Sequence, residues 1–132
     1  MKVLLVDDDP SSGSFITQAL MAENYVVNLV TDGDTALKIA HSCPYELIVL
    51  NLLSPPQVGE QLCRILRKNG YQGILMMLSR QGQSEAQLEC VRSLQAGADD
   101  CFRPSDDLQE LITRVQQLVE SSAQASLSRS LP

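Results

Sequence analysis

The feature that most constrains this chain is an alternation of short apolar runs with segments of helical periodicity. The runs lie at residues 2–6, 25–30, 46–50 and 73–78, and a shorter one spans 100–102. Runs rich in Val, Ile, Leu and Met are typical of parallel strands that are buried on both faces. Each run is followed by a segment in which apolar residues recur every three or four positions. Five such units predict a parallel sheet covered by helices on both faces.

The ends of the helical segments carry their own signals. Asp9 and Pro10 supply an N-cap and an N1 proline for the first helix, and Gly70 and Gly97 predict the ends of the third and fourth. The last helical pattern runs to about residue 121, and the remaining residues, 122–132, are polar and rich in Ser. The sequence therefore predicts one domain over residues 1–121 and a flexible C-terminal tail or linker over 122–132.

Composition narrows the function classes. A chain of 132 residues with 44% hydrophobic residues can bury the core of one domain. The net charge of -6 and the pI near 4.6 oppose binding to phosphate backbones, so we expect no direct contact with nucleic acid. The N-terminus lacks a signal-peptide pattern, and no apolar run approaches the ~20 residues of a membrane span. We therefore expect a cytoplasmic protein without membrane contact.

The cysteines give no metal or disulfide pattern. Cys43, Cys63, Cys90 and Cys101 lie at wide, irregular spacings without a CxxC motif, and His41 is the only imidazole. We interpret them as reduced thiols that pack in the interior, with Cys101 as a small core residue in preference to a redox sensor. We expect His41 to be a surface residue.

Polar residues follow the buried runs where the strands should end. Asn51 ends the most apolar run, Asp7 and Asp8 follow the first run, and Ser79 follows the fourth. Ligands of such sheets bind at the carboxyl ends of the strands. Two acids directly after a buried strand repel each other, which a simple helix cap does not require, so they favour a site over a cap. Ser79 is equally consistent with an ordinary turn residue, and Asn51 with a side chain that bonds neighbouring loop amides.

Three stretches carry a family resemblance: "VLLVDDDP", "IVLNLLSPPQVGEQLCRILR" and "AGADDCFRP". On these the chain resembles the receiver domain of two-component response regulators, in a degenerate, pseudo-receiver form, to about residue 120. The resemblance implies a flavodoxin-like, doubly wound sheet of five parallel strands in the order 2-1-3-4-5, with five helices. It places the site at the carboxyl ends of the first, third and fifth strands.

By position, Asp7 and Asp8 match the family's magnesium-binding acidic pair, and Asn51 stands where the phosphoryl-accepting Asp is expected. Phosphoryl transfer to a receiver needs a carboxylate nucleophile and a divalent cation, and an amide cannot supply the first. It also removes one anionic ligand. We therefore expect weak Mg²⁺ binding at Asp7 and Asp8, no required cofactor and no enzymatic activity.

Other positions depart from the family pattern. Ser79 matches the switch hydroxyl, but Cys101 stands where an aromatic switch residue is usual, and Val58 where the family often has an acid. The family's Lys-Pro is replaced by Arg103 and Pro104, one residue early. These departures favour natural loss of the acceptor over an engineered Asp-to-Asn change, although both explanations remain open.

Three functions are compatible with these observations. The first is a phosphorylation-independent protein-interaction or regulatory module. The second is a genuine phosphoryl-accepting receiver whose Asp was replaced by Asn51. The third, a small flavodoxin-like binding protein or enzyme, is disfavoured because no Gly-rich phosphate loop follows a strand.

The resemblance also implies protein partners: a histidine kinase, an output domain or another signalling protein. The face formed by the fourth helix, fifth strand and fifth helix is the expected partner surface and a candidate homodimer interface. Charged residues fall there at positions similar to the family's dimer pattern: Arg92, Asp99, Asp100, Glu110 and Arg114. The same residues could instead form a solvated face with local ion pairs.

Overall fold

The computed structural model describes residues 1–52, 57–79, 83–103 and 108–130, without the side chains of 83–89, 102 and 123–130. Its strands are β1 (Lys2–Asp7), β2 (Val26–Val30), β3 (Leu47–Asn51), β4 (Ile74–Leu78) and β5 (Asp100–Phe102). Its helices are α1 (Pro10–Met21), α2 (Gly33–Ser42), α3 (Gln57–Lys68), α4 (Gln83–Ala96) and α5 (Gln109–Ser130). The five predicted βα units are confirmed, and most strand bounds differ from the predicted ones by one residue.

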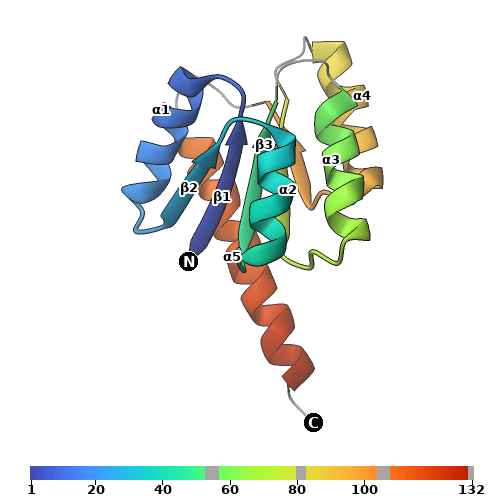
Figure 1. Cartoon of the computed structure of the whole chain (residues 1–132). Coiled ribbons are helices and arrows are strands. Elements are labelled where there is room, and N and C mark those ends of the chain that lie inside the picture. The colour runs from blue at the N-terminus through green and yellow to red at the C-terminus, as the bar shows by residue number, and fades with distance from the viewer. Residues whose placement is uncertain (53–56, 80–82, 104–107, 131–132) are drawn as a thin grey trace.

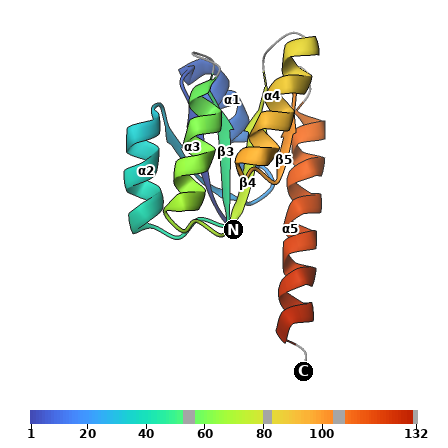
Figure 2. The same cartoon turned by 90° about the vertical axis from the view of Figure 1, so that its right-hand side faces the viewer.

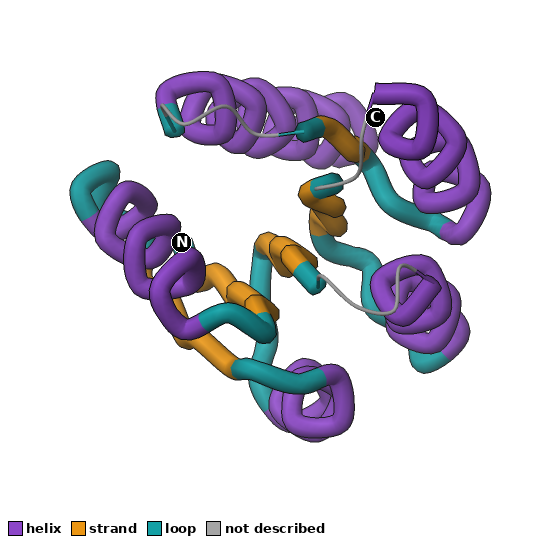
Figure 3. The backbone as a smooth tube through the Cα atoms, turned by 90° about the horizontal axis from the view of Figure 1, so that it is seen from above, coloured by secondary structure: helices purple, strands orange, loops and turns teal. Residues whose placement is uncertain are grey.

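The strands form one parallel sheet in the order β2-β1-β3-β4-β5, which confirms the predicted fold class. Helices α1 and α5 cover one face, and α2, α3 and α4 cover the other (Figure 1). Figure 3 looks onto the edge at which the strands end, with the helices around it. In the register of the sheet, Asp7 pairs with Asn51, so the ends of β1 and β3 lie side by side.

Two apolar clusters explain the continuous apolar runs. Successive residues of a strand point to opposite faces, so Leu4 and Val6 pack under α2 and α3, while Val3 and Leu5 pack under α1 and α5. Every residue of β3 and β4 is buried. The central strands therefore need apolar residues at consecutive positions, which is the pattern seen in the sequence.

The predicted helix ends are present. The Asp9 carboxylate accepts a hydrogen bond from the Ser11 N–H at 3.0 Å and caps α1, with Pro10 as its first residue. Gly70 and Gly97 have φ angles of 96° and 119° and follow α3 and α4. These are left-handed conformations that favour glycine.

The C-terminal segment differs from the prediction in its local structure. Helix α5 continues to Ser130, so residues 122–130 are helical where we expected a flexible tail. Figure 2 shows α5 projecting well beyond the sheet. The segment contains neither Gly nor Pro and has Ala, Ser and Gln at most positions, so nothing in it stops the helix. The domain boundary at residue 121 and a linker role for the segment stay predictions.

The cysteine prediction is wrong for two of the four residues. Cys90 of α4 and Cys101 of β5 form a disulfide. Their spacing forms no motif, but packing of α4 beside β5 brings their Cα atoms to 5.2 Å. Cys43 and Cys63 are free thiols, as expected, and burial raises the pKa of Cys63 to about 12. His41 is exposed, as predicted.

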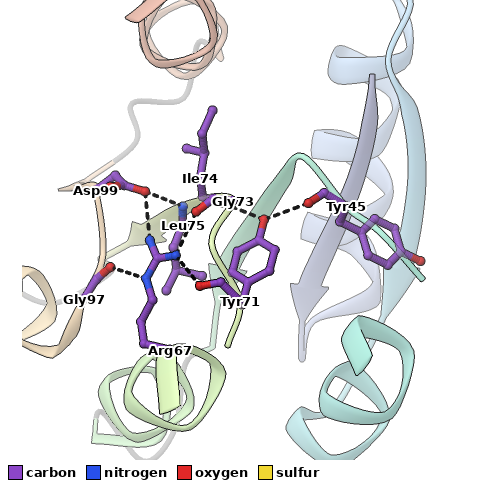
Figure 4. Close-up of polar contacts among 8 residues, drawn as sticks. All are labelled: Tyr45, Arg67, Tyr71, Gly73, Ile74, Leu75, Gly97 and Asp99. Atoms are coloured by element: carbon purple, nitrogen blue, oxygen red, sulfur yellow. Dashed lines mark hydrogen bonds and ion pairs between the residues drawn. The ribbon is translucent and has the colours of Figure 1, made fainter. Parts of the chain in front are cut away.

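An arginine holds together the turns at the opposite end of the sheet (Figure 4). Arg67, in the last turn of α3, donates from Nε to the Gly97 carbonyl at 2.9 Å and from Nη1 to the carbonyls of Tyr71 and Gly73, both at 2.8 Å. Its Nη2 contacts Asp99 at 3.0 Å. The side chain therefore fixes the turns that precede β4 and β5, and thus the start of both strands.

Tyr71 extends this cluster toward β3. Its hydroxyl lies 3.2 Å from the Tyr45 carbonyl and 3.1 Å from that of Ile74, as drawn in Figure 4. Burial raises the pKa of Tyr71, so the phenol stays protonated and donates. Tyr71 and Tyr45 also line a cavity of about 300 Å³ at this end of the sheet.

In the described part of the chain, no helix is both long and apolar enough to cross a membrane.

Candidate functional site

The polar centre of the carboxyl edge is a pair of fully buried side chains. Asp7 is the last residue of β1 and Asn51 the last of β3, and both have an exposed fraction of 0%. The Nδ2 of Asn51 donates to Oδ2 of Asp7 at 2.9 Å and to the Ser12 hydroxyl oxygen at 3.2 Å. The structure therefore brings together Asp7 and Asn51, as the positions of the two residues predicted.

The second oxygen of Asp7 is also engaged. Its Oδ1 accepts a hydrogen bond from the Asp9 N–H at 2.8 Å. The N-cap of α1 is Asp9 itself, so capping does not account for Asp7. Asp8 lies between these two residues and is exposed. Asp7 thus connects the end of β1, the end of β3 and the entry into α1.

Ser12 was not identified from the sequence. It lies in the first turn of α1, which starts directly after the acidic loop. The only available signal was a short polar residue three positions after Asp9, where a helical turn brings it back over the end of β1.

Electrostatics explains why an amide suits this position. A buried carboxylate is costly unless a donor or a cation balances its charge. The Asn51 N–H is such a donor, whereas a carboxylate at residue 51 would place a second negative charge against Asp7. Hydrogen bonds within the chain therefore satisfy the pair without a cation.

A magnesium ion would find few ligands here. Asp7 and Asp8 supply carboxylates, and the Asn51 side chain adds one carbonyl oxygen. Both oxygens of Asp7 already accept hydrogen bonds, and Asp8 is exposed. Within the described residues, no group of three or more His, Cys, Asp and Glu side chains could hold a metal.

The other predicted site residues are dispersed. Ser79 directly follows β4 and is fully buried at the same edge. Arg103 follows β5 and is exposed, unlike the buried pair. Cys101 contacts Cys90 of α4. Pro104 lies outside the described residues, as does the loop 53–56 that directly follows Asn51 and Leu52.

The charged residues of the α4-β5-α5 face form ion pairs within the chain. Arg114 contacts Asp100 at 2.9 Å and Glu110 at 3.3 Å. Asp99 pairs with Arg67, and Arg92 is exposed. This arrangement matches the alternative of a face with local ion pairs, and the homodimer stays a prediction.

The fold and this edge define the class of the protein: an α/β domain with a doubly wound parallel sheet and an acidic carboxyl edge. Residues 3–116 match the family model of the response regulator receiver domain. The chain belongs to that family.

Two solved structures and a curated relative illustrate the match. The response regulator RppA from Synechocystis is 35% identical over 126 residues, covering 94% of this chain and 53% of RppA. The receiver domain of Francisella response regulator 1452 has a TM-score of 0.80 and 29% identity, covering 92% of this chain and 98% of that one.

The second structure is the receiver domain of the sensor histidine kinase PA1611 from Pseudomonas aeruginosa, which holds a magnesium ion in its active-site cleft. Its TM-score is 0.77 at 27% identity, with 90% of this chain and 97% of that one covered.

The chain spans about half the length, or less, of the curated relatives it matches. Receiver domains are in general non-enzymatic signalling modules that bind Mg²⁺ at this edge.

Proposed function

We propose that this receiver domain is a protein-interaction or regulatory module that works without accepting a phosphoryl group. The observation that carries the proposal is the hydrogen bond from Asn51 Nδ2 to Asp7 Oδ2 at 2.9 Å. A phosphoryl acceptor must present an ionised oxygen to the donor. Residue 51 instead turns its N–H toward Asp7, and its amide nitrogen is not a nucleophile.

The same contact argues for weak metal binding. Mg²⁺ at this edge would neutralise the charge of an acidic cluster. Here residue 51 is a neutral amide that donates a hydrogen bond to Asp7, so the cluster has one negative charge fewer to neutralise. Asp7 and Asp8 are the residues that would hold the ion. Hydrogen bonds within the chain satisfy the buried pair, so the proposed module requires no cofactor. A module that acts by binding other proteins is also not an enzyme.

The proposed partners are proteins: a histidine kinase, an output domain or another signalling protein, met in the cytoplasm. The face built from α4, β5 and α5 is the proposed contact surface, and a homodimer through this face is part of the proposal. Val91 and Leu94 of α4 support it, since their exposed fractions are 51% and 49%. The two residues are three positions apart, so they lie on one face of the helix, and burial of that face against a partner would be favourable. The proposal keeps a domain boundary at residue 121, with residues 122–132 as a C-terminal tail or linker.

The test is intact-mass spectrometry after incubation with acetyl phosphate and Mg²⁺. We expect the mass of the wild-type chain to stay unchanged. The Asn51→Asp variant, treated in parallel, restores the chemical group that a donor can phosphorylate and checks the reagents. A stoichiometric gain of one phosphoryl group on the wild-type chain would overturn the proposal.

A second candidate, a phosphoryl-accepting receiver in which Asn51 replaces the native Asp, is favoured by the retained, buried Asp7 and Ser79. The codon at position 51 of the native gene decides between the two.

A further inference from the structure

The Cys90–Cys101 pair joins two elements of the proposed partner surface. Cys90 lies in the second half of α4, and Cys101 is the middle residue of β5. Cys101 also occupies the position at which the family resemblance predicts an aromatic switch residue. A covalent bond between these residues therefore fixes α4 against the strand that would otherwise carry the switch.

We propose that Cys90 and Cys101 form a reversible, redox-sensitive disulfide, and that its state sets the conformation of the α4-β5-α5 face. The proposal goes beyond the proposed function and does not depend on it, because no phosphoryl group is involved. Three observations support it: the geometry of the pair, its exposure relative to the other thiols, and its connection to α5.

The geometry allows the bond without movement of the backbone. The Cα atoms are 5.2 Å apart, inside the range of roughly 4.4–6.8 Å that disulfides require. The two cysteines come from a helix and a strand that pack against each other, so folding alone brings them together. Breaking the bond removes a covalent constraint on the movement of α4 relative to β5.

Exposure separates this pair from the buried thiol. Cys63 is fully buried, and burial raises its pKa to about 12, so it is a poor source of thiolate. Cys90 and Cys101 are half-buried and thus partly open to solvent. Cys43 is also half-buried, but it is a free thiol at the other end of the sheet, where it lines the cavity. Only the Cys90–Cys101 pair combines partial exposure with a thiol partner in the described structure.

The bond completes a connection across the surface. Asp100 precedes Cys101, and its carboxylate oxygens lie 2.9 and 3.0 Å from Nη1 of Arg114 in α5. The ion pair ties β5 to α5, and the disulfide ties β5 to α4. Oxidation therefore joins three elements into one unit, whereas reduction removes the covalent tie between α4 and β5.

The chemistry balances with a small-molecule disulfide, such as oxidised glutathione, as the oxidant. One cysteine thiolate attacks a glutathione sulfur, forms a mixed disulfide and releases one glutathione thiolate. The second cysteine attacks the protein sulfur of that mixed disulfide and releases the other glutathione. The protein loses two electrons and two protons, which leave with two molecules of reduced glutathione. A dithiol reverses both steps. In a reducing compartment such a bond forms transiently, as in redox sensors.

Peptide mapping tests the bond. The full chain is incubated in glutathione buffers of increasing oxidised fraction, denatured in acid, alkylated and digested with trypsin. The two cysteines fall in different peptides, 81–92 and 93–114, because trypsin cleaves after Arg92 and leaves the Arg103–Pro104 bond intact. We expect the two peptides to be joined under oxidising conditions and separated by dithiothreitol.

Internal and matched controls are available in the same chain. Cys43 and Cys63 share the peptide 39–64, which should carry two alkyl groups under every condition. Cys101→Ser should abolish the joined species, and Cys43→Ser should leave it unchanged. Independent alkylation of Cys90 and Cys101 at every glutathione ratio would overturn the proposal, as would a bond that forms only between two chains.

Hydrogen exchange tests the conformational half. Amides of α4 and β5 should exchange about tenfold more slowly in the oxidised wild-type chain than in the reduced one, because the bond suppresses local opening. Amides of β1 and β3 should not respond, and the Cys101→Ser variant should show no difference between the two conditions. Equal exchange of α4 and β5 in both redox states would show that the bond regulates nothing.

Discussion

Replacing Asn51 with Asp should convert the most buried polar contact of the domain into a repulsion. In the wild-type chain, Asn51 Nδ2 lies 2.9 Å from Asp7 Oδ2, and neither residue is exposed. Asn51→Asp exchanges the donating nitrogen for an oxygen of the same size. The shape of the site is conserved, so the effect on stability is electrostatic.

The magnitude follows from this distance. Two unit charges 2.9 Å apart repel by about 6 kcal/mol at an effective dielectric constant of about 20. Protonation of the introduced carboxyl limits the penalty, because protonating an Asp of pKa ~3.9 at pH 7 requires only about 4 kcal/mol. The protonated form can donate to Asp7 as the amide did. We therefore expect a loss of about 4 kcal/mol at pH 7 and about 1.5 kcal/mol at pH 5.

The sign of the pH dependence distinguishes this mechanism from a packing defect. The pKa of the introduced carboxyl is raised in the folded state, so above pH ~4 the unfolded state holds fewer protons than the folded state. The destabilisation relative to wild type therefore grows as the pH rises. A cavity or a steric clash would cost the same at both pH values.

Urea unfolding with EDTA at pH 5 and pH 7 measures these differences. Asn28→Asp is the matched control: Asn28 is exposed on β2, and its Oδ1 already accepts the Tyr45 hydroxyl at 2.7 Å. Its effect should stay within ~0.5 kcal/mol. Mg²⁺ at a hundred times its Kd should return about 2.7 kcal/mol to the Asn51→Asp variant. An Asn51→Asp chain as stable as wild type at both pH values would refute the reasoning.

Restoring the carboxylate should not restore a switch. In the family, the switch hydroxyl and the Lys gather the phosphoryl oxygens, and the movement reaches an aromatic side chain on β5. Here Arg103 is exposed and Cys101 has no ring. Titration of Asn51→Asp with beryllofluoride and Mg²⁺ should therefore shift amide resonances near residue 51 and leave those of α4 and β5 almost unchanged. Shifts of equal size in α4 and β5 would show an intact relay.

Two further changes test other contacts. Arg67→Met removes three partly buried hydrogen bonds to carbonyls and the exposed contact with Asp99, and it should lower the free energy of unfolding by about 3 kcal/mol. Arg64→Met, one turn earlier and exposed, should cost less than ~0.5 kcal/mol, and equal losses in urea unfolding would remove the special role of Arg67. Arg114→Glu should weaken homodimerisation in sedimentation velocity because it reverses the charge beside Asp100, while the exposed Lys68→Glu change at the end of α3 should not. A sharp monomer peak at high concentration that does not change with Arg114→Glu would exclude the dimer.

The parts of the fold that local chemistry determines could be predicted. Buried apolar runs indicate central strands, Asp9 and Pro10 indicate a helix start, and the glycines at 70 and 97 indicate helix ends, since each signal acts within a few residues. Parallel pairing then places Asp7 beside Asn51, because the carboxyl ends of neighbouring strands share one edge.

The contacts that could not be predicted join residues that are distant in sequence and carry no motif. Arg67 reaches Gly97 and Asp99 across about thirty positions, as its separations of 30 and 32 show. Cys90 and Cys101 meet only because α4 packs beside β5. Periodicity reports which face of an element is buried but not which side chains of two elements meet there.

Asn51 and Cys101 occupy the two positions between which the family resemblance implies a switch relay. A switch moves only when some event stabilises one of its two states more than the other. In the proposed function, residue 51 donates a hydrogen bond to Asp7 and accepts no phosphoryl group, so phosphoryl chemistry supplies no differential contact at the carboxyl edge. A disulfide between Cys90 and Cys101 is such a contact, because the bond exists in one redox state and is absent in the other. We therefore expect the redox state of the thiol pair to stabilise one conformation of the α4-β5-α5 face over the other.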